Sequence, residues 1–546
     1  MKVENCLAYA LMKEHDSDLY GYAPAYDGAG TEELVYALDA YKSYCVYEHG
    51  AGEKDFADYC RKLEREGYVR DSAKTANGNA FAAYTNGHSI VNVSYIRYRD
   101  VDKYVVQDIS YVAIAVDSVR NSTLPDRCGE YEAITTVQVS MVNILTLVVR
   151  LADGRFLVID SGLHRDADRV YDTLCQQNVR GGKPVIAAWL FSHAHSDHVG
   201  GFIGILEKYG DAVEVQRVVH HFPGEATYMG KNYMEGIPNR EGENMTARSN
   251  DIHRLMREKM PEGRFAIAHA GQTFAYPGVQ IEVLMTTENI VQKQMFDTNM
   301  SSVVYLLTMP NGKLLALGDA VDAEAKILRK IYGETLKCDA VVLAHHAYNG
   351  GDEELYHNTG ATAAIWPNYT ETLVSRGLIG HFTNHFDYNR VKYNFMMSQN
   401  GPVMTLYHGM PADEIAHFTP KFDVKHADAV CYACRRNPQH YLTADQLREG
   451  YGNAPRYYGK GEETETLVMN PEDKTYVLTI SGAAEEDFAY YCNSLKRDGY
   501  VRMSDSQEEG RLCAVYADPL NEVGVSYLDG VITITVGRAG RNVLQY

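Results

Sequence analysis

The chain has 546 residues, which is too long for one ordinary domain and enough for about three. Lysine and arginine total 52 against 72 aspartate and glutamate residues, so the formal net charge is −20 at pH 7. A chain this acidic has no overall attraction for a polyanion. The charge therefore argues against a long nucleic-acid duplex as partner, but a small phosphorylated substrate held by metal ions is compatible with it.

The amino-terminal sequence has a short apolar stretch broken by tyrosine and no small-residue cleavage site, so we expect no secretory signal. No run of about 18 apolar residues is present, and we expect no transmembrane helix and no membrane partner. The ten cysteines are scattered from Cys6 to Cys513, as is typical of reduced thiols. A lone CxxC pair, Cys431 and Cys434, receives no functional assignment. These features together predict a cytoplasmic protein.

A duplicated segment organises the two ends of the chain. EKDFADYCRKLEREGYVRDS at residues 53–72 returns as EEDFAYYCNSLKRDGYVRMS at residues 485–504, and the register continues without a gap beyond them. Each copy reads as a strand, a helix that ends at a glycine, and further short strands. We therefore expect two copies of one small α+β domain, which pack on the central domain or on each other. One lies within residues 1–125, and the other occupies residues 470–546 after a linker at residues 421–469.

Each copy carries a tyrosine just after its helix, Tyr68 in the first and Tyr500 in the second. We expect both to pack in a core. The alternative is that they line a ligand surface next to Arg70 and Arg502.

Between the copies, at residues 130–420, apolar runs alternate with helical patterns. The runs include MVNILTLVVRL, RFLVID, VIAAWLFS, KLLALGD and AVVLAH, and helices are predicted at RDADRVYDTLCQQN, DIHRLMREKM and AEAKILRKIYG. Continuous apolar strands interleaved with helices indicate sheets buried under helices, which is an α/β layered domain. Polar residues collect where several strands end, and such folds build their sites there.

The densest polar block is FSHAHSDHVGG at residues 191–201. The preceding strand delivers His193 and His195, two residues apart and so on one side of extended chain. Asp197 and His198 follow where the chain turns into a helix. This geometry directs the two pairs at two neighbouring centres. Imidazole and carboxylate ligands suit zinc best, with manganese or iron as alternatives.

The block resembles the HxHxDH motif of the metallo-β-lactamase fold superfamily, and the resemblance extends over the central segment. Asp160 in LVIDSG, Asp319 in LLALGDA and His345 in VVLAHHAYNGG follow the family pattern in order. The resemblance implies a metallo-β-lactamase-like αββα sandwich at residues 130–420. It also implies that Asp160 braces the site and does not bind metal.

The resemblance further implies two divalent metal ions, Zn²⁺ first and Mn²⁺ or Fe²⁺ as alternatives. The implied ligands are His193 and His195 for one ion, Asp197, His198 and His345 for the other, and Asp319 as the bridge. His346 is the alternative to His345 as ligand. If His345 binds the metal, His346 contacts or protonates the leaving group, or braces a ligand.

One part of the family pattern is absent. Many members supply a third histidine to the first metal about twenty residues before the bridging aspartate. The corresponding stretch, FDTNMSSVVYLL at residues 296–307, contains none, and Asp297 or Asn299 is the candidate for an oxygen ligand instead. The NxxS pattern followed by two histidines resembles the branch with nuclease-like domains of bacterial competence proteins and choline-phosphate esterases.

Two such ions would lower the pKa of a shared water and supply hydroxide near neutral pH. We expect Asp197 to orient this nucleophile and accept its proton, in a dinuclear metal-dependent hydrolase. The expected small-molecule substrate is a phosphoester or phosphodiester. A lactone, thioester or amide hydrolase of the same fold is one alternative, and a non-catalytic, metal-stabilised binding protein is another. The sequence carries no indication of oligomeric state.

The sequence contains further histidines outside these motifs. His220 and His221 follow a strand-like VQRVV, and we expect a surface or packing role, with an approach to the site as the alternative. The remaining ones near predicted loops receive no role: His269, His381, His385 and His408.

Overall fold

The computed structural model describes residues 23–38, 43–102, 105–127, 133–223, 240–290, 298–310, 312–348, 350–376, 378, 391, 393–397, 403–408, 457, 462–470, 475–497, 500–508, 510–517 and 521–538. The chain divides into two compact units. The first contains residues 1–345, 350–360 and 405–421, and the second contains residues 346–349, 361–404 and 422–546. Over the described ranges, no helix has both the length and the apolar composition needed to cross a bilayer.

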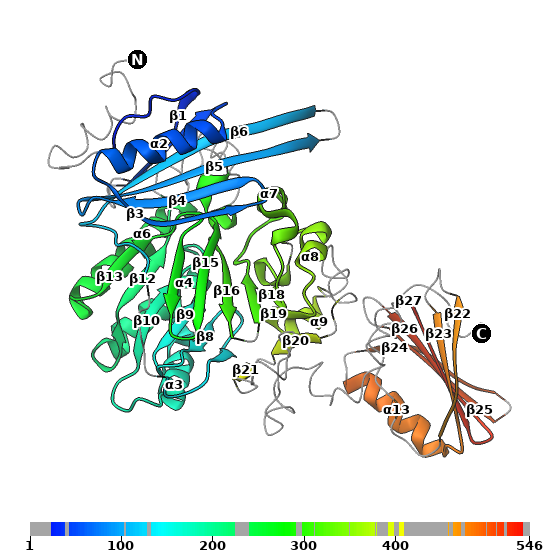
Figure 1. The fold of residues 1–546 in the computed structure, drawn as a ribbon. Helices are drawn as coiled ribbons and strands as arrows, with labels where there is room; N and C mark the ends of the chain where they lie inside the picture. Colours follow the sequence, from blue (N-terminus) through cyan, green and yellow to red (C-terminus); the bar gives the residue numbers. More distant parts are fainter. Residues whose placement is uncertain are drawn as a thin grey trace. The chain divides into compact units, whose positions relative to one another are not determined.

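An antiparallel sheet of six strands opens the first unit (Figure 1, blue). Its strands, in sheet order, are β1 (Thr31–Leu38), β2 (Ser43–His49), β6 (Val105–Ser118), β5 (Ser89–Asp102), β4 (Asn79–Thr85) and β3 (Val69–Ala76). Helix α2 (Glu53–Arg65) buries Tyr59, Cys60 and Leu63 against the sheet. Tyr68 is buried in the same core and bonds Ser89 Oγ at 2.8 Å, so the packing role expected for it is confirmed.

This sheet is attached to the rest of the first unit by polar and aromatic contacts. The Asn79 side-chain amide donates to the carbonyl of Ile331 at 2.8 Å, and the Phe81 and Tyr332 rings are stacked with an interplanar angle of 2°. Lys74 pairs with Glu282 close to these rings. The amino-terminal sheet therefore packs on the central segment, against β15 (Val279–Met285) and α7 (Asp322–Tyr332).

The central α/β architecture expected from the alternating pattern is present as two mixed sheets with helices (Figure 1, cyan to green). In sheet order, the first has β13 (Arg264–Ile267), β12 (Arg217–His220), β10 (Val185–Leu190), β9 (Phe156–Ile159), β8 (Leu147–Arg150), β7 (Gln138–Met141) and β21 (Met404–His408), with β11 (Glu214–Val215) on β10. The second contains β14 (Thr273–Tyr276), β15 (Val279–Met285), β16 (Val304–Met309), β17 (Gly312–Ala316) and β18 (Ala340–Val342).

The helices fall between strands, as their periodicity predicted. They are α3 (Ala167–Gln177), α4 (Ser196–Tyr209), α6 (Arg240–Lys259), α7 (Asp322–Tyr332) and α8 (Glu353–Thr359). Helix α4 packs against both α3 and α6. Its apolar residues Val199, Phe202 and Leu206 are fully buried, which fits a helix covered on several sides.

One apolar run was read wrongly from the sequence. MVNILTLVVRL is not a single strand, because β7 and β8 form an antiparallel hairpin that turns within it. The Asn143 side-chain oxygen accepts the backbone N–H groups of Leu145 at 3.0 Å and Thr146 at 2.8 Å. Such a local side-chain bond stabilises a turn, and here the turn is buried, so apolar composition did not mark it.

Strand direction brings the predicted site residues to one edge. Strands β9 and β10 are parallel, and Asp160 and His193 follow their carboxyl ends. Strands β17 and β18 are also parallel, and Asp319 and His345 follow theirs. Parallel pairing of these strands therefore brings together Asp160 with His193, and Asp319 with His345, although they are distant in sequence.

The second unit contains the parallel pair β19 (Ala363–Tyr369) and β20 (Tyr393–Met397), the short helix α9 (Thr370–Ser375), and a six-stranded antiparallel sheet. In order this sheet has β22 (Glu462–Asn470), β23 (Thr475–Ser481), β27 (Val531–Arg538), β26 (Asn521–Leu528), β25 (Arg511–Ala517) and β24 (Val501–Glu508). Helix α13 (Glu485–Arg497) follows its second strand, as α2 does in the amino-terminal sheet. Tyr500 is buried in its core. The predicted domain boundaries stay predictions, and Cys431 and Cys434 lie outside the described residues.

Gly201 in α4 provides a test of how the helix is seated. A Cβ there would lie 2.0 Å from the carbonyl oxygen of Ser161, and the Gly201 N–H donates to the Gly162 carbonyl at 2.9 Å. We expect Gly201→Ala to lower the free energy of unfolding by about 1–3 kcal/mol, because the helix must shift away from this turn. Urea unfolding followed by circular dichroism measures the effect.

The matched control is Gly52→Ala, where a Cβ would meet only Asp55 Oδ2 at 3.7 Å. It should lower stability by less, about 0.5–1 kcal/mol, because Gly52 is the N-cap of α2, where alanine is less favourable than glycine. Equal midpoints for Gly201→Ala and the wild type would contradict the tight seating of α4.

Candidate metal centre

Asp160 connects the first strand of the site to the histidine block. Its backbone has a φ of 52°, an uncommon value for a residue other than glycine. Its Oδ1 accepts the Ser192 N–H at 2.8 Å, and its Oδ2 accepts the Ser192 hydroxyl at 2.8 Å. His198 Nδ1 lies 2.9 Å from the same Oδ2. Because a carboxylate oxygen accepts, His198 donates through Nδ1 and presents Nε2 on its other side.

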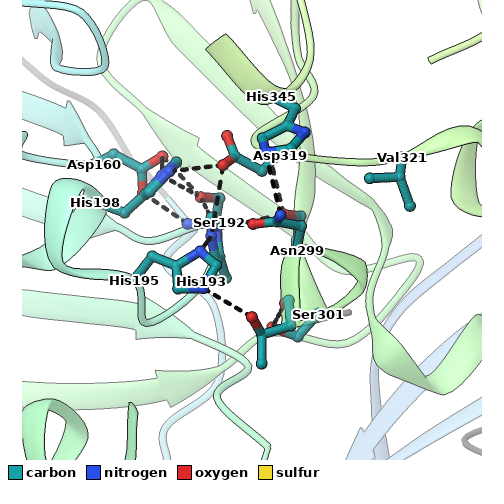
Figure 2. Close-up of polar contacts among 12 residues, drawn as sticks. Asp160, Ser192, His193, His195, His198, Asn299, Ser301, Asp319, Val321 and His345 are labelled. Carbon is teal, nitrogen blue, oxygen red and sulfur yellow. Dashed lines mark hydrogen bonds and ion pairs between the residues drawn. The ribbon is translucent and has the colours of Figure 1, made fainter. Parts of the chain in front are cut away.

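His198 Nε2 is 3.2 Å from Asp319 Oδ2, and His193 Nε2 is 3.8 Å from the same oxygen (Figure 2). These three side chains are almost completely buried. One possible ligand atom from each lies within 4.8 Å of the others, so the three can surround a single ion. The structure thus brings together three predicted ligands from two different strand ends and the start of α4.

Hydroxyl groups orient these side chains. Ser192 Oγ lies 3.1 Å from His193 Nδ1 and 3.0 Å from His198 Nδ1. Ser302 Oγ lies 3.4 Å from His193 Nδ1 and accepts the Asp319 N–H at 3.0 Å. Neither serine was predicted as a site residue. The sequence could have indicated them only by position, since Ser192 stands directly before the HxHxDH block and Ser302 ends the NxxS pattern.

His195 lies at the edge of the buried cluster. It is half-buried, and its Nδ1 is 2.6 Å from His193 Nε2. Its Nε2 is 2.7 Å from Thr298 Oγ1. Thr298 belongs to the stretch in which the family pattern has a third histidine. A hydroxyl oxygen therefore contacts His195, one of the two ligands predicted for the first ion.

His345 follows β18 in a left-handed backbone conformation, with a φ of 49°. Its N–H donates to the Gly318 carbonyl at 3.0 Å, which holds it next to the segment that carries Asp319. Asn299 Nδ2 is 3.2 Å from His345 Nε2 (Figure 2). Asn299 is thus adjacent to a predicted ligand, and its role as an oxygen donor to the first metal stays a prediction. Asp297, the other oxygen candidate, lies outside the described residues.

Two predicted catalytic residues remain. Asp197 is half-buried in the first turn of α4, immediately before His198. His346 is buried and belongs to the second unit, where its carbonyl accepts the Asn368 amide at 3.0 Å. The choice between His345 and His346 as ligand stays a prediction.

The electrostatics of the cluster favour a cation. Burial, together with the neighbouring rings of His198 and His195, lowers the pKa of His193 well below its usual value. Burial alone would lower the pKa of His198, but the carboxylates of Asp319 and Asp160 outweigh it and raise that pKa well above its usual value. Imidazole nitrogens and carboxylate oxygens are donors that zinc, iron and manganese accept, so the donor set fits a divalent ion.

Comparison with known families agrees with this arrangement of strands and side chains. Residues 141–363 match the family model described as the metallo-beta-lactamase superfamily. The matched range contains Asp160, the block at residues 191–201, Asp319 and His345. Among curated proteins, the chain has no match.

Several solved structures are similar to parts of the chain. A Cronobacter sakazakii metallo-beta-lactamase with a HARLDQ motif is 17% identical at a TM-score of 0.21, over 34% of this chain and 63% of that one. CmlA, a diiron beta-hydroxylase from Streptomyces venezuelae, is 12% identical at a TM-score of 0.31, over 50% of this chain and 55% of that one. Zn²⁺-bound PqqB from Methylobacterium extorquens is 13% identical at 0.25, over 47% and 69%.

The present chain spans less than two thirds of the Cronobacter enzyme and of CmlA. The family match, however, covers strands β8 to β18 and the strand ends at which the buried histidines and aspartates meet. The chain therefore contains a domain of the metallo-beta-lactamase superfamily, at residues 141–363.

Proposed function

We propose that this chain is a dinuclear metal-dependent hydrolase that acts on a small-molecule phosphoester or phosphodiester. The observation that carries the proposal is the convergence of His193, His198 and Asp319 in a buried cluster with ligand atoms within 4.8 Å of one another. Such a cluster is costly to bury unless a cation compensates it.

In this proposal each predicted ligand keeps its assignment. His193 and His195 hold the first ion, Asp197, His198 and His345 hold the second, and Asp319 bridges the two. The brace from Asp160 supports the assignment of His198, because it fixes which ring nitrogen faces Asp319. We propose Zn²⁺ as the ion, with Mn²⁺ or Fe²⁺ as alternatives.

When bound, the two ions would supply a nucleophilic water with a pKa near neutrality and would polarise the substrate. The side chains of the chain position the reactants. Asp197, half-buried at the start of α4, orients the attacking water and accepts its proton. His346 is proposed to contact or protonate the leaving group.

The preference for a phosphate ester rests on oxygen-bearing side chains beside the proposed metal ligands. Thr298 and Asn299 stand where the family pattern has its third histidine. Thr298 contacts His195, a proposed ligand of the first ion, and Asn299 contacts His345, a proposed ligand of the second. Oxygen donors are harder than imidazole and suit ions that also bind phosphate oxygens. The net charge of −20 is no obstacle, since the ions would meet the substrate charge locally.

Metal analysis of the purified chain, combined with a substrate panel, tests the proposal. The panel contains a bis-aryl phosphate, an aryl phosphate, a lactone, a thioester and a β-lactam. We expect bound divalent metal and turnover of a phosphate ester that chelation abolishes and added metal restores. Turnover of the lactone or thioester alone would show that the substrate is not a phosphate ester but belongs to one of those two classes. Metal without any turnover would favour a metal-stabilised binding protein.

Asp197→Ala tests the proposed roles of Asp197 as metal ligand and proton acceptor. We expect kcat to fall by about 10²–10⁴-fold or more, because the variant lacks a ligand of the second ion and the group that orients and deprotonates water. Circular dichroism should be unchanged. His88→Ala removes an exposed histidine outside the cluster and serves as the control. Turnover at the wild-type rate in Asp197→Ala would show that the mechanism is wrong.

Asp160→Asn tests the brace. The amide cannot accept from both Ser192 and His198 as the carboxylate does, so His198 loses its fixed orientation. We expect metal affinity to fall about 10–100-fold, measured by competition with a chromophoric chelator. Asp168→Asn, an exposed carboxylate on α3, is the matched control. Equal affinities for the two variants would exclude a role for Asp160 in holding the metal ligands.

A further inference from the structure

A second buried cluster lies at the ends of the neighbouring parallel strands β12 and β13. His221 directly follows β12, and His269 is the second residue after β13. Glu288 lies in the short 3-10 turn at Thr287–Asn289. His221 and His269 are each 1% exposed and Glu288 is 6% exposed. One possible ligand atom from each lies within 4.8 Å of the others. None of these residues belongs to the proposed dinuclear site.

His269 is bonded through both ring nitrogens. Its Nε2 lies 2.6 Å from Asp117 Oδ2, and its Nδ1 lies 2.6 Å from Glu288 Oε1. Carboxylate oxygens only accept, so the Asp117 contact assigns the ring proton to Nε2. A neutral ring then turns the lone pair of Nδ1 toward Glu288. That contact is favourable only if Nδ1 carries a proton or if both atoms bind the same metal ion.

His221 has a matching orientation. Its Nδ1 lies 2.7 Å from the carbonyl oxygen of Ala268, which can only accept. Nδ1 therefore carries the ring proton and Nε2 carries the lone pair. Metal-binding histidines regularly donate their second nitrogen to a carboxylate or a backbone carbonyl. His269 and His221 show these two arrangements, with Asp117 and Ala268 as the acceptors.

Glu288 is also held in place. The Thr286 hydroxyl lies 3.2 Å from Glu288 Oε2, and the Glu288 N–H donates to Thr286 Oγ1 at 3.2 Å. Hydrogen bonds of this kind fix the carboxylates of metal sites as well. The remaining carboxylate oxygen, Oε1, is the one that faces His269.

We propose that His221, His269 and Glu288 bind a further divalent metal ion, with Asp117 orienting the imidazole of His269. The charge balance supports this assignment. Two carboxylates and two neutral imidazoles carry a charge of −2 in a buried space, which a divalent ion neutralises. One proton on His269 would leave a buried net charge of −1, and such charge is costly. Without the ion, burial opposes protonation, but Asp117 and Glu288 raise the pKa of His269 to about 10.

Two imidazoles and one carboxylate are a ligand set that Zn²⁺ accepts, with a fourth position left for a water molecule. Asp117 lies near the carboxyl end of β6, which belongs to the amino-terminal sheet. The Gln272 amide adds a contact between the same segments, at 3.3 Å from Asn92 Oδ1. The ion would therefore fasten the amino-terminal sheet to the central sheets.

Metal stoichiometry of the full chain tests the site. We expect His221→Gln and Glu288→Gln each to hold about one equivalent of zinc less than the wild type, by mass spectrometry after dialysis. Asp319→Asn should lose metal from the other site, and the double variant with His221→Gln should show both losses. If the dinuclear proposal fails, His221→Gln should still hold less zinc than the wild type, so the two proposals are tested separately.

Crystals of the wild-type chain give a test that does not depend on variant folding. We expect an anomalous difference peak at the zinc edge among His221 Nε2, His269 Nδ1 and Glu288 Oε1, and also in Asp319→Asn. Absence of the peak, or unchanged metal content in soluble His221→Gln, would overturn the site. The cluster would then be an imidazolium held between two carboxylates.

Discussion

The candidate centre depends on the hydrogen bonds that the buried carboxylate of Asp160 accepts. This carboxylate fixes Ser192 through two hydrogen bonds and His198 through one, and so joins the end of β9 to the histidine block after β10. A charged group in such a place is tolerated only because every one of these bonds is made. The resulting rigidity sets which nitrogen of His198 faces Asp319. The same backbone segment also seats α4, since Gly201 donates to the Gly162 carbonyl.

Two clusters of imidazole and carboxylate share one edge of the first central sheet. The proposed dinuclear site follows β10, and the further proposed metal site follows β12 and β13, which lie next in the sheet. Parallel strands place their carboxyl ends together, so residues that leave these ends are concentrated there. The two clusters differ in their surroundings. The first includes the half-buried His195 and Asp197, as a substrate site requires, whereas the second is enclosed.

Among the described residues, the amino-terminal sheet contributes Asp117 of β6 to the second cluster. Asn79, Phe81 and Lys74 on β3 and β4 contact the central segment elsewhere. These contacts attach the sheet to the central segment. The carboxyl-terminal sheet has the same strand order, with its helix at the same point in the chain.

The sequence by itself determined the features that are local or periodic. The alternating apolar runs predicted the central α/β class, and the block at residues 191–201 predicted His193 and His198 because its spacing is written in six residues. The apolar run MVNILTLVVRL predicted one strand where the structure has the β7–β8 hairpin, because Asn143 stabilises a turn inside the run. Only the tertiary structure decided that Ser302 would orient His193, or that His221, His269, Glu288 and Asp117 would meet. Those residues lie on separate elements, and their proximity depends on strand order and packing, which no local pattern encodes.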